Sequence, residues 1–247
     1  MNTVGQRVAA AEVDAVVVCT PHGVHVAEHL CVVTAARASG VIEGDGAPVS
    51  VSCAVDRDLA IACTAAISSA GVPVVAVSYG GNDPVAAVMP LDWGAAIPLW
   101  HILRHAPHLR TVIVSPARDL NAGAHVEAGA AIARAAQSVG RRIAFIASAD
   151  QGHGHSASSP YGWHAESVVF DRRITALVRS GELERLVDID AAEVHAAVAD
   201  SWWQMLMLLG ALRETATEYR SEVLAYEAPT YYGMLTAVVT PGETGSG

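Results

Sequence analysis

The chain has 247 residues, enough for one large domain or two small ones, and 52% of them are hydrophobic, which allows a sizeable buried core. Its net charge is −10 and lysine is absent; an acidic chain without basic runs argues against nucleic acid or an anionic membrane as a partner. No apolar run reaches the roughly eighteen residues of a membrane span, and no secretory signal pattern follows Met1, so we expect a soluble, cytoplasmic protein.

The first half of the chain alternates short apolar runs with turn residues and one alanine-rich helical segment. Gly71 follows that segment where a helix would end. The last segment of this half, 122–138, has the pattern of an amphipathic helix. We expect strands over 13–18, 30–36, 49–55, 72–77 and 111–115, and helices over 57–69, 99–103 and 122–138.

The second half begins with an apolar strand over 143–147 and continues mainly as helices. A helix is expected over 165–179 with Gly181 at its end, then a short acidic helix, then a long helix over 191–212 whose second half is apolar all round and therefore buried. Strands alternating with helices predict an α/β fold, with a central mixed β-sheet flanked by helices. No repeat or linker interrupts the chain, so we expect a single domain over 1–247.

The cysteines lie in unrelated apolar contexts between residues 19 and 63, and none forms a CxxC pair. In a cytoplasmic protein this pattern favours reduced thiols in the core. The four residues are Cys19, Cys31, Cys53 and Cys63.

Histidines follow two of the predicted strands, and strand ends are where loops present functional side chains. His22 lies between a proline and a glycine after the first strand, which favours a functional role, whereas His25 and His29 are better explained as surface residues. His153 and His155 follow the strand at 143–147. They alternate along the loop, so an extended backbone would let only one of them face a pocket. An imidazole there could serve as a general acid or base, or simply bind the backbone.

Asp200 is the one charge entering the apolar half of the predicted long helix. A carboxylate there is costly to bury unless it is paired or bound to metal, although a surface position is equally compatible with the sequence. Two histidines and one carboxylate on one face of a metal are typical of non-haem Fe(II) oxygenases. Glu227 and Tyr231 are a further candidate pocket wall, or simple packing. His125 and His195 are expected on exposed helix faces.

Five stretches, in this order, resemble the class III extradiol ring-cleavage dioxygenases, the family of the protocatechuate 4,5-dioxygenase beta subunit. The resemblance covers nearly the whole chain. No single stretch is diagnostic of the family, and the resemblance depends on all five occurring in the family's order. The stretches are Asp14-Ala-Val-Val-Val-Cys-Thr-Pro-His22, Pro90-Leu-Asp-Trp-Gly-Ala-Ala-Ile-Pro-Leu99, Ser148-Ala-Asp-Gln-Gly-His153, Phe170-Asp171 and Met205-Leu-Met-Leu-Leu-Gly-Ala-Leu212.

The resemblance implies an enzyme that opens catechol-type or aminophenol-type rings with O2 and a non-haem Fe(II) cofactor. It implies His22 and Asp200 as metal ligands and His153 as the catalytic acid or base beside the substrate hydroxyl. Where family members carry another pocket histidine, this chain has Trp93, whose ring could stack on an aromatic substrate.

The same comparison marks departures from the family pattern. The family's first histidine ligand, in an N-terminal His-x-Pro turn, has no counterpart here. His25 and His29 are the candidate substitutes, and the carboxylate is the shorter aspartate. Two functions therefore stay open: an Fe(II)-dependent extradiol dioxygenase, or a non-catalytic homologous subunit or ligand-binding protein without a complete metal site. A small aromatic molecule and O2 are the expected partners, in a homo-oligomer or a heteromer with a related subunit.

Overall fold

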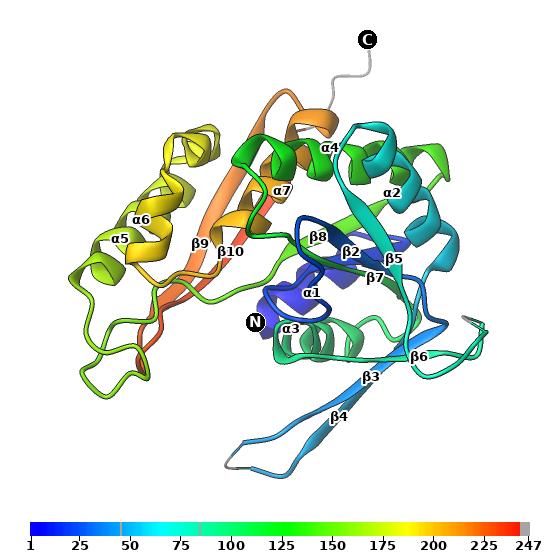
Figure 1. The fold of residues 1–247 in the computed structure, drawn as a ribbon, viewed down its shortest axis with the longest axis horizontal. Coiled ribbons are helices and arrows are strands. Elements are labelled where there is room, and N and C mark those ends of the chain that lie inside the picture. Colours follow the sequence, from blue (N-terminus) through cyan, green and yellow to red (C-terminus); the bar gives the residue numbers. More distant parts are fainter. Residues whose placement is uncertain (45, 84, 243–247) are drawn as a thin grey trace.

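A five-stranded sheet lies at the centre of the computed structural model, which describes residues 1–44, 46–83 and 85–242 (Figure 1). The strand order is β5-β2-β7-β1-β8. β1 runs parallel to both of its neighbours and β2 runs antiparallel to β7, so the sheet is mixed, as predicted. Its strands are β1 (Ala15–Cys19), β2 (Leu30–Val33), β5 (Val74–Val77), β7 (Arg110–Ser115) and β8 (Ile143–Ala147).

Strand β1, which lies between β7 and β8, is buried along its whole length, because helices cover both faces of the sheet. An unbroken run of small and β-branched residues suits that position, since every side chain meets another layer. β1, β7 and β8 are parallel, so the loops that follow them leave the sheet at the same edge.

Helices form layers on both sides of the sheet: α2, α4 and α7 lie above it in Figure 1, and α1 and α3 lie below it. The fold is thus the predicted α/β domain with helices flanking a mixed central sheet. No helix in the described ranges has the length and apolar character needed to cross a membrane. The helices are α1 (Asn2–Ala10), α2 (Arg57–Ser69), α3 (Trp93–Leu103), α4 (Ala122–Ser138) and α7 (Trp202–Thr215).

Helices α4 and α7 touch backbone to backbone. A Cβ built on Gly129 would lie 1.8 Å from the Met207 carbonyl oxygen, and one built on Gly210 would lie 1.8 Å from the Val126 carbonyl oxygen. Both glycines are therefore required by close packing rather than by a turn. His125 on α4 is fully buried, so the expectation that it is exposed was wrong; its Nδ1 donates to the Asn121 carbonyl instead.

The remaining strands form two smaller sheets. A three-stranded sheet of order β4-β3-β6 extends below the central sheet in Figure 1, and an antiparallel hairpin of β9 and β10 stands beside α5. Only β4 coincides with a predicted strand. These strands are β3 (Arg37–Ile42), β4 (Val49–Ala54), β6 (Val88–Pro90), β9 (Tyr219–Glu227) and β10 (Met234–Pro241).

The predicted helix over 191–212 is two helices, α6 (Ala191–Ala196) and α7, preceded by α5 (Ala165–Ser180) and the 3₁₀ helix η1 (Leu183–Asp188). The chain breaks between α6 and α7, and Val198 there has a positive φ of 49°. The break frees backbone carbonyls for partners in another loop. The second half of the predicted helix is buried as expected, and it packs on α5 residues in a separate apolar cluster.

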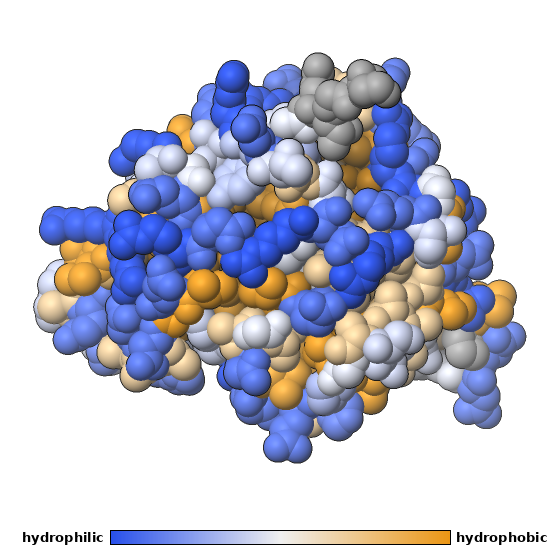
Figure 2. Space-filling model, turned by 90° about the horizontal axis from the view of Figure 1, so that it is seen from above, coloured by the Kyte–Doolittle hydropathy of each residue, from blue (hydrophilic) through white to orange (hydrophobic). Residues whose placement is uncertain are grey.

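Seen from above, the surface mixes hydrophilic and hydrophobic residues, with hydrophobic ones grouped toward the middle of that face (Figure 2). Such mixing is ordinary for a folded protein. The loops after β1, β7 and β8 meet at one edge of the sheet, and the candidate functional residues lie in this region.

Candidate functional site

The loop after β1 holds His22 by its backbone and leaves its side chain exposed. The His22 carbonyl accepts a hydrogen bond from Ser115 Oγ (2.8 Å), and its N–H donates weakly to Thr20 Oγ1 (3.4 Å). Thr20 Oγ1 in turn donates to Asp92 Oδ1 (2.5 Å), the carboxylate that caps the start of α3. The backbone of His22 is thus tied to β7 and α3, while the imidazole faces outward.

A pocket of about 370 Å³ adjoins His22 and is lined by Val41, Leu91, Asp92 and Trp93 as well. Trp93 lies at its rim with 63% of its surface exposed. A single aromatic ring fits a pocket of this size, and an exposed indole offers it a face for stacking.

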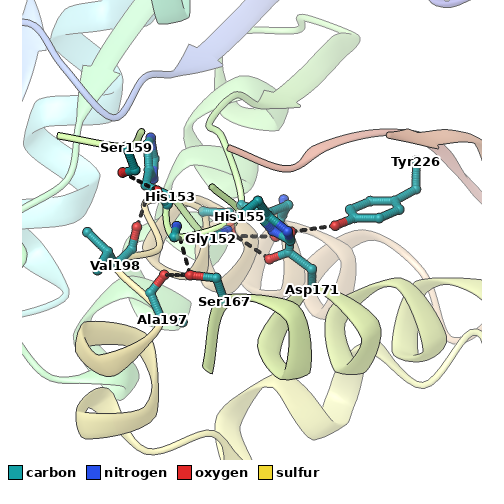
Figure 3. Close-up of polar contacts among 12 residues, drawn as sticks. Gly152, His153, His155, Ser159, Ser167, Asp171, Ala197, Val198 and Tyr226 are labelled. Atoms are coloured by element: carbon teal, nitrogen blue, oxygen red, sulfur yellow. Dashed lines mark hydrogen bonds and ion pairs between the residues drawn. The ribbon is translucent and has the colours of Figure 1, made fainter. Parts of the chain in front are cut away.

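His153 is held far more tightly than His22, and only 9% of it is exposed. Its Nδ1 lies 2.7 Å from the Val198 carbonyl oxygen in the break between α6 and α7 (Figure 3). A carbonyl oxygen can only accept, so Nδ1 carries the proton and Nε2 is left as the atom that can take or give one. Nε2 lies 3.8 Å from Asp150 Oδ2.

The loop that carries His153 is clamped from both sides (Figure 3). Gly152 N–H donates to Asp171 Oδ1 (2.7 Å), and Gly154 N–H donates to Ser167 Oγ (2.9 Å). The His153 carbonyl accepts from Ser159 Oγ (2.7 Å). The backbone on either side of His153 therefore has its own partner on α5, which fixes where the imidazole stands.

His155 points away from His153 and binds Asp171, one of the α5 residues that hold the His153 loop. Its Nε2 donates to Asp171 Oδ2 (2.7 Å), and the Tyr226 hydroxyl donates to the same oxygen (2.6 Å). Burial raises the pKa of the Asp171 carboxyl, while the bonds from Tyr226, Gly152 and His155 lower it. Of the two alternating histidines, His153 is thus the one whose Nε2 is not used by the fold.

Aromatic rings surround His153. Tyr161 meets it edge-on with ring centroids 5.9 Å apart, and the rings of Tyr231 and Tyr232 lie 6.1 and 5.8 Å away. Tyr231 therefore belongs to the surroundings of His153, whereas Glu227, its companion in the predicted wall, is exposed at the end of β9. The tyrosines limit water around the imidazole and give an aromatic molecule apolar surface to contact.

Asp150, which sequence reasoning did not single out, connects the two predicted histidines. Burial raises the pKa of its carboxyl, the nearby charge of Asp200 raises it further, and His153 and His22 lower it. His22, His153 and Asp200 therefore all lie within electrostatic reach of Asp150, and we call these four residues the histidine site. Asp150 lies in the loop after β8, so the parallel-strand rule could have found it.

Asp200 does not stand free in this site. Its Oδ1 forms an ion pair with Arg118 Nη1 (2.9 Å), and Arg118 Nη2 also donates to the Pro21 carbonyl (3.3 Å). The guanidinium carbon lies 5.1 Å from the centre of the Trp203 ring, a cation–π contact. Arg118 follows β7 at the same sheet edge and was also missed, because no local pattern relates it to a residue 82 positions later.

The predicted metal ligands do not form a complete metal centre. Within residues 1–44, 46–83 and 85–242, no three histidine, cysteine or acidic side chains gather closely enough to hold a metal ion. His25 is exposed and lines a different pocket, and His29 Nδ1 donates to the Ala27 carbonyl (2.8 Å). The structure thus brings His22, His153 and Asp200 together but supplies neither of the suggested substitutes.

A family model described as the catalytic LigB subunit of aromatic ring-opening dioxygenase matches residues 1–238. Protein CA_C1420 of Clostridium acetobutylicum is 22% identical over 227 residues, and the chain spans about half of that relative, 92% of this chain against 48% of the other. A crystal structure of the uncharacterized protein JW3007 from Escherichia coli K12 has the same fold, with a TM-score of 0.60, 17% identity and coverage of 98% of this chain and 92% of that one. The match over residues 1–238 shows that this chain belongs to the LigB family of aromatic ring-opening dioxygenases.

Proposed function

We propose that the protein binds a small catechol-type or aminophenol-type aromatic compound beside the histidine site, and that His153 exchanges a proton with a ring hydroxyl. The observation that carries this proposal is the fixed tautomer of His153, whose Nδ1 is occupied by the Val198 carbonyl while Nε2 stays available. Family membership supports an aromatic ligand, because the family model describes aromatic ring-opening dioxygenases.

The geometry suits proton transfer in three ways. The imidazole is held at a fixed place by the clamped loop, so a bound hydroxyl would meet Nε2 without reorganisation. The rings of Tyr161, Tyr231 and Tyr232 contact an aromatic ligand and keep water away. The Asp150 carboxyl group lies 3.8 Å from Nε2, so it stands next to the atom that would receive the proton of the hydroxyl.

Ring cleavage with Fe(II) and O2 is the second candidate function, and family membership favours it, since dioxygenases of this family are typically dependent on non-haem iron. His22 and Asp200 would be the ligands. The residues as placed do not fit that cofactor, because Asp200 is paired with Arg118 and the described residues contain no group of three ligands. We therefore assign no step to iron.

The binding function is tested by anaerobic calorimetric titration of the purified protein with catechol and with 2-aminophenol, in the presence of EDTA. We expect saturable binding that His153→Gln weakens about tenfold, the effect of losing one hydrogen bond of about 1.4 kcal/mol. His108→Gln is the matched control, because it removes an exposed imidazole that lies just before the opposite end of β7. Absence of binding by both compounds would contradict the proposal.

The ring-opening function is tested separately by adding Fe(II) anaerobically, then catechol and oxygen, and following oxygen uptake and the yellow ring-opened product. Product formed in proportion to bound iron would establish the second candidate. The cytoplasmic location, the domain limits of 1–247 and the homo-oligomer or heteromer with a related subunit stay predictions.

A further inference from the structure

Arg118 reaches into the histidine site from the loop after β7, and three groups hold its guanidinium there. It pairs with Asp200 at 2.9 Å, donates to the Pro21 carbonyl at 3.3 Å and lies over the Trp203 ring at 5.1 Å. Pro21 immediately precedes His22, and Asp200 lies two residues before the start of α7. The guanidinium therefore joins the two backbone segments that carry the predicted metal ligands.

We infer that the Arg118 guanidinium takes the place of a divalent cation in the histidine site, so that the protein binds its ligand without metal. The inference deepens the proposed function and rests on it for the position of the ligand. It concerns which positive charge the site contains, and this can be measured without any aromatic compound.

The charges of the site support this inference. The Asp200 side chain is only 18% exposed, so its carboxylate needs a positive partner, and Arg118 already provides one. A metal bound to Asp200 would lie about 2 Å from the carboxylate oxygen and hence a few ångströms from the guanidinium. Two like charges at that separation repel strongly in a partly buried site, and arginine cannot relieve the repulsion by losing its proton.

The chemistry of the ligand follows from this replacement. A guanidinium donates hydrogen bonds but has no open coordination positions, so it cannot chelate two ring oxygens as a metal does. The ligand class is therefore a hydroxylated aromatic held by hydrogen bonds and ring contacts, with His153 Nε2 as the proton acceptor. Binding should persist in EDTA.

The test is a titration with Co(II) alone, which takes the same nitrogen and oxygen ligands as Fe(II) and resists oxidation by air. It is followed by calorimetry and by the visible absorption of bound Co(II). We expect wild type to bind weakly, and Arg118→Gln to bind Co(II) at least about tenfold more tightly, because the substitution removes the competing positive charge and leaves the Asp200 carboxylate without its cationic partner. Arg118→Lys keeps the positive charge and should behave like wild type.

Arg141→Gln is the matched control. Arg141 forms an equivalent ion pair with Asp56 (3.1 Å) away from the histidine site, and its side chain has the same 38% exposure as that of Arg118. This variant should gain no Co(II) binding, and adding Asp200→Asn to Arg118→Gln should abolish the gain. Circular dichroism establishes that each variant is folded.

Two results would overturn the inference: tight one-to-one Co(II) binding by wild type that Asp200→Asn removes, or a folded Arg118→Gln variant that gains none. The proposed function fails by a different observation, the absence of catechol and 2-aminophenol binding, so the two failures are distinguishable.

Discussion

The two sides of the histidine site differ in how firmly their histidines are held. On the His153 side, the imidazole and the backbone around it are bonded to α5 and to the break before α7. On the His22 side, only the backbone is fixed and the imidazole is exposed next to an open pocket. Asp150 lies within electrostatic reach of both histidines and of Asp200, which is paired with Arg118.

This difference indicates that the two histidines have different roles. A group that must transfer a proton benefits from a fixed position and a fixed tautomer, which the His153 side provides. A group that only lines the entrance, or that would need a metal to be ordered, gains nothing from such a scaffold. The comparison predicts that substitutions on the His153 side cost stability, whereas those on the His22 side affect ligand binding alone.

The largest expected effect is that of Asp171→Ala. The substitution leaves Gly152 N–H, His155 and the Tyr226 hydroxyl without their shared acceptor in a fully buried position, so we expect a loss of about 3 kcal/mol in the free energy of unfolding. Urea denaturation measures it. His22→Ala, on the other side, should change stability by less than about 0.5 kcal/mol. Equal losses of stability in Asp171→Ala and His22→Ala would contradict the difference between the two sides of the histidine site.

Ser167→Ala should have the next largest effect. The hydroxyl accepts from Gly154 N–H and donates to the Ala197 carbonyl, so it joins the His153 loop to the break between α6 and α7. We expect a loss of about 2 kcal/mol in the free energy of unfolding, together with weaker catechol binding. Ser180→Ala is a control, because its hydroxyl is bonded at the partly exposed end of α5. A variant as stable as wild type would show that the Ser167 contacts with Gly154 and Ala197 are not needed for stability.

The stability of the His153 side should depend on pH, because Asp171 on this side is a buried carboxyl group with a raised pKa. The pKa of Asp171 is raised in the folded state, so the unfolded chain ionises first as pH increases. The stability of wild type relative to Asp171→Asn should thus be greatest below the ordinary aspartate pKa and decline as pH rises through the raised value. Urea midpoints of both proteins across that window measure the difference. A relative stability that increases with pH would contradict the sign.

The smallest effect is expected at the rim of the pocket. Trp93→Ala removes an exposed ring, so stability should be nearly unchanged, while catechol binding should weaken by a few-fold if the indole stacks on the ligand. Replacing the similarly exposed Trp163 should leave binding unchanged, because it does not line this pocket. Unaltered binding in Trp93→Ala would remove this residue from the site.

Sequence patterns predicted the central sheet well, because β1 is a run of residues that suits complete burial and neighbouring strands follow the same rule. They missed the break at 197–201, where no glycine or proline marks an end. The backbone turns there because the carbonyls of Ala197 and Val198 bind the distant His153 loop. The hairpin of β9 and β10 was missed because its aromatic, glycine-containing turn was interpreted as a pocket wall.

For the site, sequence placed His22, His153 and Asp200 in one family pattern, and the structure brings them near Asp150. Their roles stay predictions. The Arg118–Asp200 pair could not be predicted, since it joins two loops 82 residues apart and depends on how β7 and α7 are placed in the fold.

The glycine contact between α4 and α7 bears on any attempt to redesign this protein. The backbones of α4 and α7 touch at Gly129 and Gly210, so α7 cannot shift toward α4. The residues just before α7 are therefore held in a fixed position relative to α4. An engineer who wished to install a metal centre would have to exchange side chains around Asp200 rather than shift the helix. The loops after β1 and β7 carry His22 and Arg118, so substitutions there would alter the histidine site while leaving the contact between α4 and α7 in place.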